Sequence, residues 1–143
     1  MAKILTVVIP TYNMEKYLDR CLTSLIVTNN DLLERLEVLV VIDGAKDRSS
    51  EIAHSYQIRY PQTFIVIDKE NGNYGSCVNR GVAEATGKYI KILDADDWFD
   101  LDTVSTLVKH MDENQLDVAR FNYVREYGDK SLEKKNTFLE ERV

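Results

Sequence analysis

Short β-branched runs alternate with stretches of helical spacing along most of this chain, and this alternation is the feature that most constrains its fold. The runs that predict buried strands are residues 4–10, 36–43, 64–68 and 88–94, with 117–124 as a candidate fifth strand. The stretches that predict helices are residues 15–28, 49–60, 75–84 and 101–114. Strands that alternate with helices favour parallel pairing through right-handed crossovers. We therefore predict an α/β fold with a Rossmann-like, mostly parallel sheet and helices on both faces. From about residue 128 onward the pattern weakens.

The length and charge of the chain narrow its class. Its 143 residues are enough for one modest domain with a hydrophobic core. Its net charge of −6 argues against a nucleic-acid partner, because nucleic acids attract basic surfaces. The two cysteines, Cys21 and Cys77, form neither a disulfide framework nor a metal set. The apolar run near the N-terminus is too short for a signal segment or a membrane span, so we expect a cytoplasmic protein.

Polar residues follow each of the first four predicted strands. Thr11, Tyr12 and Asn13 come after the first strand, and Asp43 with Gly44 ends the second. The stretch "KENGNYGS" follows the third strand, and "DADD" follows the fourth. Parallel sheets of this kind bind ligands at the carboxyl ends of their strands. We expect these four polar clusters to lie on one rim of the sheet and to form a binding site.

Three carboxylates, Asp94, Asp96 and Asp97, crowd the end of the fourth strand. Alternate carboxylates in an Asp-x-Asp turn can face one point, and Mg²⁺ uses one or two carboxylates together with phosphate oxygens. Such a cation would neutralise a departing pyrophosphate. The alternative is that these are turn and N-cap residues before the next helix, which is our interpretation of Asp100. The spacing alone leaves both interpretations open.

Other residues on this rim give weaker signals. A carboxylate at Asp43 can accept hydrogen bonds from a base or a ribose, or it can be an ordinary turn aspartate before a glycine. Gly72 and Gly75 would let the backbone approach a ligand closely. Tyr12 could stack on a base, although an aromatic residue at a rim often only packs.

The order of these motifs resembles family 2 glycosyltransferases. "TVVIPTYNMEKYLDRCLTSL" is similar to the first strand, Pro-Thr-Tyr-Asn turn and first helix of that family. "VLVVIDGAKDRSSEIA" resembles its second strand, with the aspartate-glycine turn that follows. "ENGNYGSCVNRGVAEATGKYIKILDADDWF" resembles its glycine-asparagine loop and its Asp-x-Asp-Asp-Trp signature. The resemblance runs from about Leu5 to Leu107.

This resemblance implies a GT-A fold that binds a nucleotide-diphosphate sugar with Mg²⁺ or Mn²⁺. By matched position, the residues implied to bind the donor are Pro10, Thr11, Tyr12, Glu15, Asp43, Asn71, Gly72, Asn79, Asp94 and Asp97. Asp43 would accept a hydrogen bond from the base, typically uracil, and Asp96 would be the metal ligand. Two positions depart from the family: Ile42 stands where many members have an acidic residue, and Val78 where many have arginine. The second departure removes a cation near the phosphates and leaves open how the donor is oriented.

In the family, an acceptor-binding half with the catalytic base follows this donor half. Inverting transfer needs a carboxylate that deprotonates the acceptor hydroxyl. We therefore expect a nucleotide-sugar-binding domain over residues 1–127, and a tail or the start of an acceptor-binding part over 128–143. The base would lie beyond Val143. An apolar face left uncovered would favour a homo-oligomer.

The resemblance makes sugar transfer the leading hypothesis: metal-assisted, inverting transfer from a UDP-sugar to a polysaccharide or lipid-linked acceptor. The longer enzyme would work in the cytoplasm or at the inner face of the membrane. One alternative is nucleotidyl transfer, which needs a Gly-rich, basic first loop, whereas "PTYNMEKY" offers only Lys16. The other alternative is a nucleotide-binding module without turnover.

Overall fold

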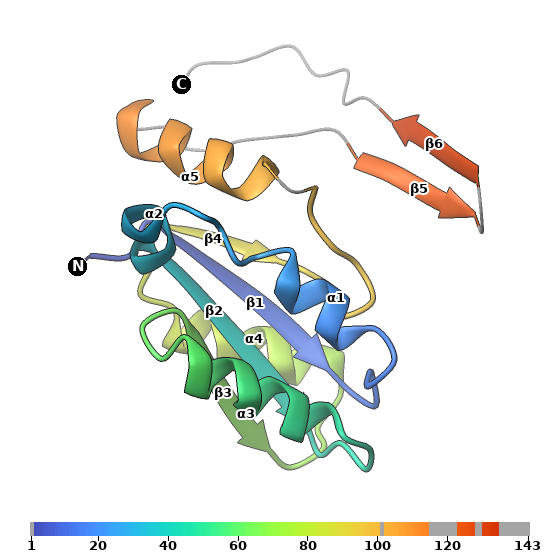
Figure 1. The fold of residues 1–143 in the computed structure, drawn as a ribbon. Helices are drawn as coiled ribbons and strands as arrows, with labels where there is room; N and C mark the ends of the chain where they lie inside the picture. Colours follow the sequence, from blue (N-terminus) through green and yellow to red (C-terminus); the bar gives the residue numbers. More distant parts are fainter. Residues whose placement is uncertain (1, 101, 115–122, 128–129, 135–143) are drawn as a thin grey trace. The chain divides into compact units, whose positions relative to one another are not determined.

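A computed structural model of the chain describes residues 2–100, 102–114, 123–127 and 130–134. The chain divides into two compact units, Met1–Glu113 and Asn114–Val143, and each is described by itself (Figure 1). The domain boundary predicted between residues 127 and 128 stays a prediction.

The first unit is built on a four-stranded sheet. Its strands are β1 (Leu5–Thr11), β2 (Leu36–Asp43), β3 (Phe64–Lys69) and β4 (Tyr89–Ile92). They lie in the order β3-β2-β1-β4, and every pair is parallel. In this register Val8 of β1 is opposite both Leu39 and Ile92. The predicted parallel sheet is thereby confirmed.

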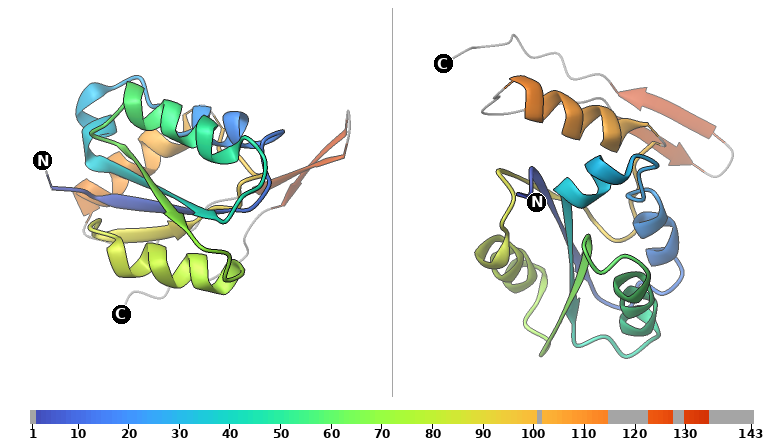
Figure 2. Two further views of the ribbon diagram at one scale, coloured as in Figure 1. Left: turned by 90° about the horizontal axis from the view of Figure 1, so that it is seen from below. Right: turned by 60° about the vertical axis from the view of Figure 1, so that its left-hand side comes forward.

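Within the part of the chain that the structure describes, five helices accompany the sheet. They are α1 (Leu18–Thr23), α2 (Asn30–Arg35), α3 (Ser49–Arg59), α4 (Tyr74–Glu84) and α5 (Thr103–Asn114). The left view of Figure 2 shows α4 on one face of the sheet and α1 and α3 on the other. Helices on both faces were predicted and are confirmed. Among the described residues, no helix is long and apolar enough to span a bilayer.

The first helix is much shorter than the predicted stretch 15–28. After Thr23 the amides of Leu25 and Ile26 donate to the carbonyls three residues earlier, which tightens the backbone out of the α-helix. The side chain of Ser24 also donates to the carbonyl of Cys21 at 2.6 Å and competes with the helical pattern. A separate helix, α2, then starts at an Asn29 cap whose side chain accepts from the amide of Leu32, and the sequence pattern did not predict it.

Strands β1 and β2 are buried along their whole length. Because helices cover both faces, their sequences read as continuous apolar runs instead of alternating ones. Helix α4 approaches β1 most closely at Gly81, where an added Cβ would lie 2.2 Å from Cγ1 of Val8. The absent side chain at Gly81 therefore sets how near α4 lies to the sheet.

A buried carboxylate fastens the amino end of the sheet. Glu37 of β2 is 4% exposed and accepts from the hydroxyl of Thr6 at 2.8 Å. Thr86 donates to the same carboxylate from its backbone amide at 2.9 Å and from its hydroxyl at 2.8 Å. These bonds connect β1, β2 and the turn that leads into β4.

In the second unit, the described residues form an antiparallel pair. Strand β5 (Tyr123–Tyr127) pairs with β6 (Lys130–Lys134), with Tyr127 opposite Lys130. Most of the predicted strand at 117–124 lies outside the described residues. The prediction of weak pattern after residue 128 missed β6.

Candidate functional site

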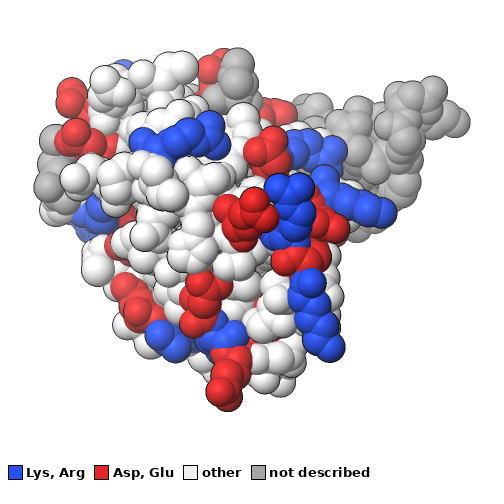
Figure 3. All heavy atoms as spheres, turned by 60° about the horizontal axis from the view of Figure 1, so that its bottom comes forward, with Lys and Arg blue, Asp and Glu red and all other residues white. Residues whose placement is uncertain are grey.

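A cavity of about 600 Å³ opens at the carboxyl ends of the strands. Its volume lies within the range of about 300–1,000 Å³ typical of small-molecule sites. The residues that line it come from the ends of β1 and β2 and from the segments that follow β1, β3 and β4: Pro10, Thr11, Tyr12, Met14, Asp43, Asn71, Asn73, Tyr74, Cys77, Asp94, Ala95 and Asp96. The surface view of Figure 3 shows acidic and basic side chains interspersed over one side of the molecule, with neither sign covering it alone.

Asp43, at the end of β2, is buried, and both of its carboxylate oxygens accept hydrogen bonds from the protein. Its Oδ1 accepts from Nζ of Lys69 at 2.9 Å and from the backbone amide of Gly72 at 2.8 Å. Its Oδ2 accepts from the amide of Asn73 at 3.1 Å. The Asn71 side chain also donates to the Asp43 carbonyl at 3.1 Å. The carboxylate therefore fixes the loop between β3 and α4.

The pKa of Asp43 reflects two opposing effects. Burial on its own would raise this pKa, because it disfavours the charged form. The hydrogen bonds from Lys69, Gly72 and Asn73, together with the positive charge of Lys69, outweigh burial and hold the pKa below its ordinary value of 3.8. Asp43 is thus an anion that accepts hydrogen bonds and donates none.

Lys69, the last residue of β3, has an acceptor for each of its three ammonium hydrogens. Besides Asp43, its Nζ donates to the carbonyl of Glu70 at 2.7 Å and to Oγ of Ser76 at 2.9 Å. It therefore connects the end of β2 with the first turn of α4.

Two unusual backbone conformations shape the same loop. Asn73 has a φ of 83°, and its side chain caps α4 by accepting from the amide of Ser76 at 3.0 Å. Gly44 has a φ of 62°, and a Cβ there would lie 2.9 Å from the amide nitrogen of Asn71. Only glycine lets the β2 end and the loop approach so closely.

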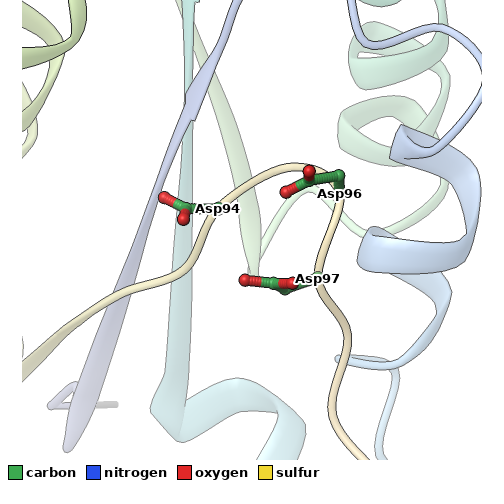
Figure 4. Close-up of side chains that lie close together, drawn as sticks. All are labelled: Asp94, Asp96 and Asp97. Atoms are coloured by element: carbon green, nitrogen blue, oxygen red, sulfur yellow. The ribbon is translucent and has the colours of Figure 1, made fainter. Parts of the chain in front are cut away.

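The second acidic feature of the cavity is the carboxylate group Asp94, Asp96 and Asp97. One oxygen from each residue lies within 4.8 Å of one from each of the others, and all three residues are exposed. Figure 4 shows Asp96 and Asp97 pointing to the same side of the turn, toward Asp94. The amide of Asp97 donates to the carbonyl of Asp94 at 3.0 Å, which closes the turn. Tyr74 donates its hydroxyl to Oδ1 of Asp94 at 2.9 Å and joins this group to α4.

The electrostatics of this group are the reverse of those at Asp43. Partial burial raises the pKa of the Asp97 carboxyl, and the negative charges of Asp96 and Asp94 raise it further. The neighbouring Cys21 thiol is buried, and burial together with the charges of Asp97 and Asp96 raises its pKa to about 12. Cys21 is therefore neutral and is a core residue. The guanidinium of Arg20 lies 3.7 Å from the ring centre of Trp98, beside the turn.

The carboxylate group suits a hard divalent cation. Mg²⁺ and Mn²⁺ favour oxygen ligands, and a cation among these carboxylates would relieve the repulsion that the charges of Lys91 and Arg20 offset only in part. One oxygen each from Asp94, Asp96 and Asp97 could contribute to such a site. The sequence predicted Asp96 as the metal ligand and Asp94 and Asp97 as donor-binding residues, and these roles stay predictions.

The structure brings most, but not all, of the predicted site residues to the cavity. Those that line it are Pro10, Thr11, Tyr12, Asp43, Asn71, Asp94 and Asp96. Asp97 belongs to the adjacent carboxylate group, and Gly72 contributes its amide to Asp43. Glu15 accepts from the amide of Arg48 at 3.3 Å, and Asn79 is an exposed residue of α4. Neither is among the lining residues, and their predicted roles stay predictions.

Sequence reasoning did not single out several lining residues, among them Met14, Asn73, Tyr74, Cys77 and Ala95. Asn73 carried a readable signal, because an asparagine directly before a helical stretch is a favoured N-cap. The sequence carried no comparable signal for Lys69, since a lysine at the end of a strand is most often a surface residue.

Comparisons with known proteins agree with this geometry. A sequence model described as glycosyl transferase family 2 matches residues 6–142. Glycosyltransferase GlyA of Streptococcus pneumoniae is 36% identical over 119 residues, which are 83% of this chain and 16% of that protein. The uncharacterized glycosyltransferase EpsJ of Bacillus subtilis is 32% identical over 130 residues, which are 91% of this chain and 37% of that protein.

A solved structure extends the comparison to the fold. The crystal structure of residues 1–349 of S. aureus TarS in complex with UDP-GlcNAc has a TM-score of 0.64 and 26% identity, over 78% of this chain and 32% of that one. The chain thus spans less than half the length of each of these three proteins.

Proposed function

The chain belongs to glycosyl transferase family 2, and we propose that it binds a UDP-sugar together with Mg²⁺ or Mn²⁺ as the donor-binding part of an inverting glycosyltransferase. The resemblance read from the sequence and the GT-A fold are both confirmed. The donor, the cation and the acceptor are proposals.

One observation carries this proposal: the same cavity is lined by a hydrogen-bond acceptor that suits a nucleotide base and by carboxylates that suit a divalent cation. Asp43 is a permanent acceptor and suits the ring N–H of uracil. Asp94 and Asp96 line the same cavity, and with Asp97 they form the group of converging carboxylates. A nucleotide diphosphate has a donor at its base and negative charge at its phosphates, so both ends find a complement.

Different residues of the cavity would bind different parts of the donor. Pro10, Thr11 and Tyr12 at the end of β1 would lie along the base and ribose. Asp96, with its two neighbours, would hold the cation, which when bound neutralises charge on the departing diphosphate. In the transfer, the acceptor hydroxyl attacks the anomeric carbon, the bond to the β-phosphate oxygen breaks, and a carboxylate base takes the hydroxyl proton. We assign that base to none of the described residues.

The wider role is proposed from the relatives. We infer a polysaccharide or lipid-linked acceptor at the cell surface, because Minor teichoic acid biosynthesis protein GgaB of Bacillus subtilis is 33% identical over 117 residues. A cytoplasmic location, at the inner face of the membrane, and self-association remain parts of the same proposal.

Calorimetry with UDP tests the proposal directly. UDP should bind with Mn²⁺ and bind at least about tenfold more weakly with EDTA, a difference of about 1.4 kcal/mol. Asp96→Asn should reduce the Mn²⁺-dependent affinity to the EDTA level. Asp31→Asn, which removes an exposed carboxylate on α2, is the matched control and should change nothing. Equal affinity with and without the metal would contradict the assigned cation site.

A further inference from the structure

Lys69 is the one cation within hydrogen-bonding distance of Asp43 among the described residues. We propose that Lys69 is a positioning residue that determines nucleotide specificity: it keeps Asp43 a pure acceptor, and so selects a base with a ring N–H. This inference rests on the proposed function, because it concerns how that site chooses its donor.

The hydrogen bonds leave room for one more donor on Asp43. A carboxylate has about four acceptor positions. Lys69 and Gly72 occupy two on Oδ1, and Asn73 occupies one on Oδ2. The thiol of Cys77, a weak donor, also hydrogen-bonds this carboxylate, so the ring N–H of uracil entering the cavity would compete for the remaining position only with that thiol. Cytosine presents a lone pair at the same ring position, so an anionic Asp43 would face it acceptor to acceptor.

The groups that face Asp43 show why Lys69 is decisive. The loop contributes neutral amides of Gly72 and Asn73, and α4 contributes Cys77. Burial and the charge of Asp43 raise the pKa of the Cys77 thiol, so Cys77 is neutral as well. Without Lys69, burial would act on the carboxyl with weaker opposition, and its pKa would rise. A protonated Asp43 could donate to cytosine, and the discrimination would fade.

Lys69 also has a structural role that a test must separate from this one. It donates to Ser76 and to the carbonyl of Glu70, so its loss could loosen the loop and weaken every nucleotide alike. Ser76→Ala removes one of these loop contacts and leaves the charge beside Asp43 in place. Lys69→Gln keeps donor hydrogens and removes the charge, and Lys69→Met removes both.

The experiment measures UDP and CDP affinity with Mn²⁺ at about pH 5.5 and about pH 8, a range in which an ordinary aspartate, with a pKa near 3.9, stays ionised. The unmodified chain should prefer UDP about tenfold at both values. In Lys69→Met and Lys69→Gln the preference should shrink, and more so at the lower pH. Ser76→Ala should weaken both nucleotides equally. Lys109→Met, an exposed lysine of α5, controls for charge and for titration of the nucleotides themselves. An unchanged preference in both Lys69 variants would overturn the proposal.

A second measurement separates this inference from the proposed function. Carboxyl carbon NMR titration should show the Asp43 pKa below 3.8 in the unmodified chain and clearly higher in Lys69→Gln. If no uridine nucleotide binds the unmodified chain, the proposed function fails, while this titration still tests Lys69. An equal Asp43 pKa in the two proteins would overturn the role of Lys69 even if UDP binds well.

Discussion

Asp43 and the carboxylate group Asp94, Asp96 and Asp97 line or border one cavity, yet the protein treats them in opposite ways. Asp43 is buried, and its two oxygens receive three donors from the chain itself. The three aspartates after β4 are exposed, and one oxygen of each lies within 4.8 Å of one oxygen of each of the others. The contrast teaches that the chain itself offsets the negative charge of Asp43, whereas Asp94, Asp96 and Asp97 keep part of their mutual repulsion.

This contrast extends to stability. A carboxylate with several donors contributes to the folded state, and one crowded by like charges opposes it. Substitutions in the two places should therefore shift the free energy of unfolding in opposite directions.

The largest effect is expected at Asp43. Asp43→Ala leaves the part-buried ammonium of Lys69 without its charge partner and two amides without an acceptor. Removing one partner of a buried pair should lower the free energy of unfolding by about 3 kcal/mol. Urea unfolding followed by circular dichroism measures this value. A loss below about 0.5 kcal/mol, the size of an ordinary surface substitution, would show that the contacts of Asp43 do not stabilise the fold.

Acid should remove the same contribution. The pKa of Asp43 in the folded state lies below the ordinary value of 3.8. The stabilisation from Asp43 is therefore complete above about pH 5 and is lost as the pH falls through 3.8 and then through the lower pKa of the folded state. The difference in stability between the unmodified chain and Asp43→Ala should shrink over this interval. A difference that stays constant down to about pH 3 would contradict the linkage.

Metal binding should produce the next largest effect. A Mn²⁺ concentration tenfold above its dissociation constant should raise the free energy of unfolding by about 1.4 kcal/mol, because the cation binds only the folded group. Asp96→Asn should lose this stabilisation, whereas Asp31→Asn should keep it. Thermal unfolding with and without Mn²⁺ measures both. Equal stabilisation of the Asp96 variant would place the cation elsewhere.

The smallest expected effect is an increase in the free energy of unfolding. Without metal, Asp97→Asn relieves repulsion from Asp94 and Asp96, and should stabilise the fold by about 0.5 kcal/mol or less, because exposed charges are screened. With Mn²⁺ the same variant should lose part of the metal stabilisation. Urea titrations at low salt make the gain measurable, and a clear loss of stability without metal would mean that Asp97 has a supporting partner.

Much of the fold and part of the site could be predicted from the sequence. The run from Val38 to Ile42 is apolar throughout because both sheet faces are covered, and runs of this kind predicted the parallel sheet and the rim. The group of Asp94, Asp96 and Asp97 was predictable because its members are neighbours along the chain. Both inferences needed only local patterns.

The remaining features depend on partners far apart in sequence. Lys69 meets Asp43 across 26 positions, and Thr86 meets Glu37 across 49. A lysine or glutamate in such a strand reads as a surface residue until the fold supplies its partner. Helix α2 was missed because its six residues are too few to show a periodic face.

The close approach of α4 to β1 has a consequence for how this protein can be altered. The first turn of α4 brings Tyr74 and Cys77 to the cavity, while its eighth residue, Gly81, packs against Val8 of β1. A methyl group at position 81 would push α4 away from Val8, and the resulting tilt of the helix would move Tyr74 and Cys77 and change the shape of the cavity. If Gly81→Ala is combined with Val8→Ala, the two Cγ atoms of Val8 that crowd position 81 are removed. The nearest remaining atom of residue 8 is then its Cβ, 3.1 Å from the new methyl group. Libraries that aim to change the donor should therefore vary Gly81 and Val8 as one unit or leave both untouched.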